Sequence, residues 1–132
     1  MRPTTIHRRM PRAGLDPIDE PATALATFSL VMHRPRRPET ILLLLDDARC
    51  GRSLLTVTGT TDPDSAIEIV EFVTGACERL GALVIASVRP GADHRHHSHD
   101  HDADVDRWLE MSELASLAGV ELLEWFVIGR DV

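Results

Sequence analysis

The chain has 132 residues, of which 43% are hydrophobic, so a single domain with a substantial core is expected. Its formal net charge is −7 at pH 7, and residues 39–132 hold eighteen acids against seven Arg, an excess that argues against a nucleic-acid-binding face. No apolar run reaches the roughly 20 residues of a membrane span, and no apolar segment follows the basic N-terminus as it does in a signal peptide.

Residues 1–22 contain four Pro and four Arg and show no apolar periodicity, which predicts a disordered tail. The alternative is an arm that contacts an acidic partner. Residues 23–132 then form the single domain. The two cysteines, Cys50 and Cys77, lack the spacing of a metal site, so we expect free thiols in a reducing, cytoplasmic environment.

Short apolar runs indicate the strands. The run Ile41–Leu45 is entirely apolar, as in a central strand that is buried on both faces. Residues 53–58 alternate more and follow a turn, which predicts a hairpin with that run. A β-prone stretch, Phe28–Met32, precedes both of them.

The clearest helix start is Asp62-Pro63, with Asp62 as the N-cap and Pro63 in the first turn. Gly81 is expected to end this helix, and Cys77 to lie on its buried face. Strands are expected near 28–33, 40–46, 53–58, 82–88 and 120–128, and helices near 63–80 and 104–118. The predicted fold class is α/β (α+β), a single mixed sheet of about five strands with two main helices packed on it.

Five of the seven histidines fall in one expected loop, residues 91–103: His94, His96, His97, His99 and His101. Their spacing is that of a flexible chelator, which binds Zn, Ni or Cu weakly and with low specificity. Three interpretations are open: a loop without a role, a metal-sensing or storage loop, and replacement ligands for a catalytic zinc. Because imidazoles titrate near neutral pH, the loop would also respond to acidification.

Several short motifs follow one another in a set order. Glu39 precedes the ILLLL run, Asp47-Ala48-Arg49 follows it, and Gly59-Thr60 leads into the first helix. Ala118-Gly119-Val120 then precedes a final LLEWFVIG segment. This ordered set resembles the JAB/MPN metalloprotease-like fold in its bacterial RadC-like form.

The resemblance, which covers residues 38–129, implies a zinc site of two His and one Asp, with a Glu that takes a proton from the bound water. Ser87 and Arg89 occupy the slots of the two His, and Arg89 is a permanent cation that repels a metal. Glu39 and Asp104 stand in the slots of the Glu and the Asp. Their alternative roles are a strand-entry acid and a helix N-cap.

The resemblance therefore implies a vestigial site without a tightly bound cofactor. Two interpretations of Arg89 stay open. It bridges Glu39 and Asp104 in place of the metal, since a guanidinium can join two carboxylates, or it points into solvent as loop residues usually do.

Three functions follow from these residues. The leading one is a catalytically inactive JAB/MPN domain that acts as a protein-interaction or scaffold module, with an unknown protein partner and with room for a homodimer. The second is a metal-binding or pH-responsive protein that acts through the histidine loop. The third is a zinc hydrolase with rearranged ligands. Neither a nucleic acid nor a membrane is an expected partner.

Overall fold

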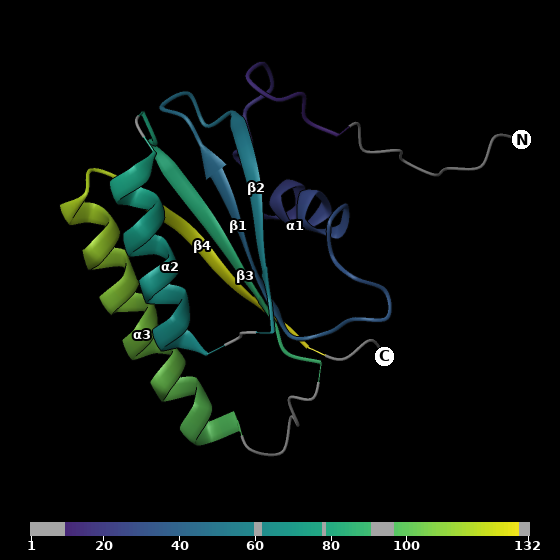
Figure 1. The fold of residues 1–132 in the computed structure, drawn as a ribbon, viewed down its shortest axis with the longest axis vertical. Helices are drawn as coiled ribbons and strands as arrows, with labels where there is room; N and C mark the ends of the chain where they lie inside the picture. Colours follow the sequence, from purple (N-terminus) through teal and green to yellow (C-terminus); the bar gives the residue numbers. More distant parts are fainter. Residues whose placement is uncertain (1–9, 60–61, 78, 91–96, 130–132) are drawn as a thin grey trace, which may run out of the picture.

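A computed structural model of the chain describes residues 10–59, 62–77, 79–90 and 97–129, with the backbone alone for residues 97–104. The elements of this part are α1 (Pro21–Ser29), β1 (Glu39–Leu45), β2 (Gly51–Thr58), α2 (Pro63–Ala76), β3 (Ala82–Val88), α3 (His97–Leu117) and β4 (Glu121–Ile128). The strands form one mixed sheet in the order β2-β1-β3-β4. Helices α2 and α3 cover one face and α1 lies on the other (Figure 1). The predicted fold class is confirmed, with four strands and three helices in the described residues.

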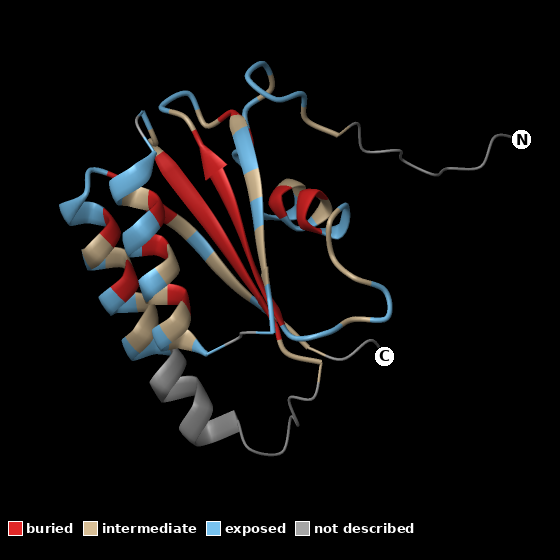
Figure 2. Ribbon diagram, in the orientation of Figure 1, coloured by how far each residue is buried: buried red, intermediate tan, exposed pale blue. Residues whose placement is uncertain are grey.

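Strands β1 and β3 form the centre of the sheet, and all seven residues of each are buried (Figure 2). They pair antiparallel, with Thr40 opposite Ser87. β1 also pairs antiparallel with β2, which confirms the predicted hairpin. β4 runs parallel to β3, because the chain crosses over through α3 between these two strands.

Alternate residues of the central strands enter two separate apolar clusters. The cluster under α2 and α3 contains Leu42, Leu44, Ala66, Val70, Val73, Leu83, Ile85, Met111, Ala115, Val120 and Leu122. The cluster under α1 contains Ile18, Ala24, Phe28, Ile41, Leu43, Leu45, Ala82, Val84, Ala86 and Val88. Each position in β1 or β3 can therefore be assigned to one face.

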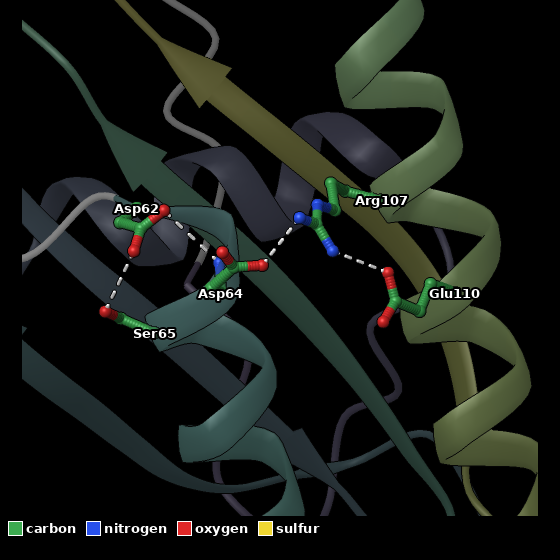
Figure 3. Close-up of polar contacts among 5 residues, drawn as sticks. All are labelled: Asp62, Asp64, Ser65, Arg107 and Glu110. Atoms are coloured by element: carbon green, nitrogen blue, oxygen red, sulfur yellow. Dashed lines mark hydrogen bonds and ion pairs between the residues drawn. The ribbon is translucent and has the colours of Figure 1, made fainter.

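The start of α2 is fixed by its predicted cap and by α3. The Asp62 side chain accepts a hydrogen bond from the backbone N–H of Asp64 at 3.4 Å. Arg107 of α3 forms ion pairs with Asp64 and with Glu110, each at 2.8 Å (Figure 3). These two carboxylates raise the pKa of Arg107. Only the pair with Asp64 joins the two helices, and because both pairs are partly exposed they contribute little to stability.

The strand predicted at residues 28–33 is wrong, because residues 21–29 form α1. Pro21 stands in the first turn, a position that needs no backbone N–H. Ala24, Thr27 and Phe28 recur at helical spacing and are buried against the sheet. This packing outweighs the β propensity of the few residues from Phe28 onward.

Both other helices differ from their predicted bounds. α2 ends at Ala76, and Cys77 is extended and exposed, so the prediction that Cys77 is a core residue is wrong. α3 begins at His97, seven positions before the predicted start. In α3, Met111 is fully buried, whereas Leu109 is 55% exposed.

Residues 10–20, which the sequence placed in a tail, contact the β1–β2 turn and the start of β2. The backbone N–H of Gly14 donates to the carbonyl of Gly51 at 3.1 Å, and that of Ile18 to Arg49 at 2.8 Å. Ile18 is only 4% exposed and belongs to the cluster under α1. Residues 1–9 are outside the described residues.

Gly81 is required by a close contact rather than by the helix end that the sequence suggested. A Cβ at Gly81 would lie 2.7 Å from the backbone of Asp47, whereas a Cβ at Gly75 in α2 would meet nothing within 4 Å. We therefore expect Gly81→Ala to lower the free energy of unfolding by about 1–3 kcal/mol, as overpacking does. Gly75→Ala should raise it by roughly 0.5–1 kcal/mol, because Ala favours the helix. Urea denaturation of both variants tests this, and equal effects of the two changes would contradict it.

Candidate functional site

Glu39, the first residue of β1, is a fully buried carboxylate. Its Oε1 accepts the backbone N–H of His33 at 3.1 Å, and its Oε2 lies 2.6 Å from His33 Nδ1. The side chain of His33 is 35% exposed. With Glu39 ionised, Nδ1 carries the hydrogen, since a carboxylate only accepts. The His33–Glu39 pair thus links the loop after α1 to the start of β1, a central strand of the sheet.

Ser87 is also fully buried, near the end of β3. Its Oγ accepts a hydrogen bond from the indole Nε1 of Trp125 in β4 at 2.9 Å. Trp125 packs against the cluster under α2 and α3. The hydroxyl that stands where the resemblance implies a zinc ligand is therefore engaged by a neighbouring strand.

Glu39 and Ser87 point to opposite faces of the sheet. Glu39 alternates with Thr40 and shares its side with Ile41, in the cluster under α1. Ser87 shares its side with Ile85, in the cluster under α2 and α3. Because strand side chains alternate with a period of two, the two residues lie at adjacent positions of the β1–β3 pair but not in one pocket.

The other two residues of the implied site are Arg89 and Asp104. Arg89 follows β3, and its backbone N–H donates to the carbonyl of Ile128 at 2.8 Å. Asp104 lies inside α3 rather than at its start, so the N-cap interpretation is wrong. The side chain of Asp104 is outside the described residues. The bridge from Arg89 to Glu39 and Asp104 stays a prediction.

The histidine segment is only partly described. His94 and His96 lie outside the described residues, whereas the backbone of His97, His99 and His101 belongs to the first turns of α3. Residues 97–103 of the expected loop are therefore helical, and His97 and His101 are four positions apart in this helix. Among residues whose side chains are described, no three His, Cys, Asp or Glu are grouped to hold a metal ion. The predicted weak binding of Zn, Ni or Cu stays a prediction.

The sequence did not indicate His33, which follows a β-prone stretch and precedes a run of Pro and Arg. Its contact with Glu39 depends on the turn that brings residues 30–38 back to the sheet, and no local pattern shows that turn. A carboxylate that holds one ring nitrogen of a histidine fixes the orientation of the ring and of its other nitrogen, Nε2. Carboxylate–histidine pairs of this kind occur in proton-transfer sites and in metal sites.

Comparisons of this chain with protein-family models, with curated proteins and with solved structures found no match. The JAB/MPN resemblance therefore depends on the motifs of this chain alone. Among the helices of the described residues, none combines the length and the apolar character that a membrane crossing requires.

We expect His33→Ala to lower the free energy of unfolding by about 1–3 kcal/mol, because it leaves a buried acceptor without its ring partner. In a Glu39→Gln background the same change should cost less, with a coupling energy of at least about 0.5 kcal/mol. Urea denaturation at neutral pH measures both, and Arg37→Ala, at an exposed position of the same loop, is the control. A His33→Ala variant as stable as the parent would show that the ring does not support Glu39.

The two cysteines should differ in reactivity. Cys50 is 5% exposed and Cys77 is exposed. Burial, followed by the negative charges of Asp46 and Asp16, raises the pKa of the Cys50 thiol, so the reactive thiolate forms only at higher pH. A disulfide reagent should therefore modify one thiol per native chain rapidly and the second only after denaturation. Cys77→Ser should abolish the rapid phase, and two thiols that react at one rate would contradict this assignment.

Proposed function

We propose that this chain is a catalytically inactive JAB/MPN (RadC-like) domain that acts as a protein-interaction or scaffold module. The observation that supports it most is the orientation of Glu39. In the implied zinc chemistry, the Glu must reach a water on the metal, but this Glu39 is held by His33 on the face opposite Ser87.

The chemistry of the other two positions supports the same proposal. Ser87 is a poor zinc ligand, and its hydroxyl is already bonded to Trp125. Arg89 carries a fixed positive charge in the slot of the second ligand, which opposes a cation there. A surface that binds another protein requires neither a metal nor an activated water.

A metal-binding role through the histidine segment is the second candidate, and the backbone of α3 favours it in one respect. Two histidines four positions apart in a helix fall on the same face, which is the spacing that helical zinc motifs use. His97 and His101 have this spacing.

Metal content and hydrolysis separate these functions. We expect untagged protein to hold no firmly bound zinc and to cleave no peptide or isopeptide bond, because the implied ligand set is incomplete. Any weak uptake of added zinc should disappear when the five histidines between residues 94 and 101 are replaced by Ala. Mass spectrometry of bound metal and calorimetric titration are the measurements. One zinc per chain that survives these replacements, together with hydrolysis, would overturn the proposal and favour a hydrolase.

A further inference from the structure

The two faces of the sheet are covered unequally. Helices α2 and α3 both lie on one face, whereas α1 is the helix on the other (Figure 1). On that second face, Ile18 joins the apolar cluster, and the backbone of Gly14 and Ile18 is hydrogen-bonded to the start of β2 and to the turn before it. At the opposite edge, Leu123, Phe126 and Ile128 of β4 are only partly buried. The described residues therefore leave the β4 side of α1 incompletely covered.

Two cavities lie along this side of α1. One, of about 220 Å³, is lined by Ala24 of α1 and by Leu123 of β4. The other, of about 350 Å³, is lined by Leu25 and Ser29 of α1 and by Ile128 of β4. Since both are bounded by the same helix and the same strand, we treat them as one feature, the α1–β4 groove.

The ends of the α1–β4 groove carry opposite charges. Asp19, Glu20 and Glu124 line the first cavity. Arg34 and Arg36 line the second. Leu123 and Ile128 mark the two ends and are five residues apart in β4, about 17 Å along a strand. This distance exceeds the Debye length of about 8 Å at physiological ionic strength. The acidic end and the basic end are therefore largely screened from each other and interact with a partner independently.

The middle of the groove is apolar. Leu25 is the central residue of α1, which spans Pro21–Ser29, and it is 39% exposed. An exposed leucine at the midpoint, between ends of opposite charge, makes the surface complementary to itself. A two-fold axis that crosses the groove at Leu25, perpendicular to α1, sets Leu25 against Leu25 and each acidic end against a basic end.

From this symmetry we infer that the occupant of the α1–β4 groove is a second copy of this chain, in an isologous homodimer whose two grooves face each other. The inference rests on the proposed interaction function and names its partner and its surface. Burial of Leu25 at the centre and of Leu123 and Ile128 toward the ends supplies the apolar contribution, because apolar area removed from water drives association. The charged ends fix the antiparallel orientation, as complementary charges do at interfaces.

The test is the mass of the full chain by sedimentation or light scattering, from about 1 µM to about 100 µM. The parent is expected to be dimeric at the upper end of this range. Leu25→Glu, which brings two carboxylates together at the axis, should raise the dimer dissociation constant by at least about tenfold. Phe72→Glu is the matched control: Phe72 lies in α2 on the other face and is 75% exposed, and its replacement should leave the dissociation constant unchanged.

Charge reversal tests the antiparallel orientation of the two grooves. This test does not depend on how the fold tolerates a substitution at Leu25. Glu124→Arg and Arg34→Glu should each weaken the dimer several-fold, since each sets like charges opposite one another. The double variant exchanges the two charges of this one pair across the interface and should return the dissociation constant to within about twofold of the parent.

Three results would overturn the inference: a monomeric parent, a dimer that Leu25→Glu leaves intact, and a double charge variant no tighter than the single ones. A monomeric parent that neither binds zinc nor hydrolyses peptides would exclude the homodimer but not the interaction function. Another protein would then occupy the α1–β4 groove. Zinc-dependent hydrolysis would remove the interaction function whatever the mass of the chain.

Discussion

The burial of β1 and β3 on both faces is the constraint on which the rest of the structure depends. Each is covered along all seven of its residues, so the sheet needs apolar cover on two sides. On one side α2 and α3 provide it, and Arg107 joins them through Asp64. On the other side the cover is assembled from α1 and from residues 10–18, which come from the part of the chain that precedes the first strand.

The same burial decides the behaviour of the polar residues in these strands. Glu39 and Ser87 are both fully removed from solvent, and an unpaired polar group in that position destabilises the fold by about 1–3 kcal/mol. Each has therefore a partner from outside its own strand, His33 for Glu39 and Trp125 for Ser87. A residue that is fixed in this way is restricted in orientation, which limits what chemistry it can perform together with residues of the other face.

The sequence predicted those features that depend on local pattern. The all-apolar run Ile41–Leu45 and the Asp62-Pro63 helix start are visible without any tertiary information, and both were found as expected. α1 was missed because its helical spacing is short and its stability comes from packing Phe28 against the sheet, including an edge-on ring contact with Phe126 at 6.3 Å. Of the candidate site, Glu39 was recognised but His33 was not, since their contact is created by a turn of the chain that has no sequence signature. The sequence alone does not show that Glu39 and Ser87 lie on opposite faces of the sheet, because that depends on which strands pair and in what register.

The unequal covering of the sheet also explains where a surface for partners can arise in so small a domain. A domain of this length buries only about two thirds of the surface of its unfolded chain. In this protein the apolar surface that stays exposed is not spread evenly over the two faces of the sheet. The helices on the α2–α3 side are two long elements of 14 and 21 residues, whereas α1 has nine. A nine-residue helix covers β1 and reaches β4 through Phe28, but it leaves Leu123 and Ile128 partly exposed beside charged residues of both signs. Because α1 is short, part of β4 on this face remains uncovered and forms an apolar surface with charged ends. An apolar centre within a charged rim is the composition of a protein interface.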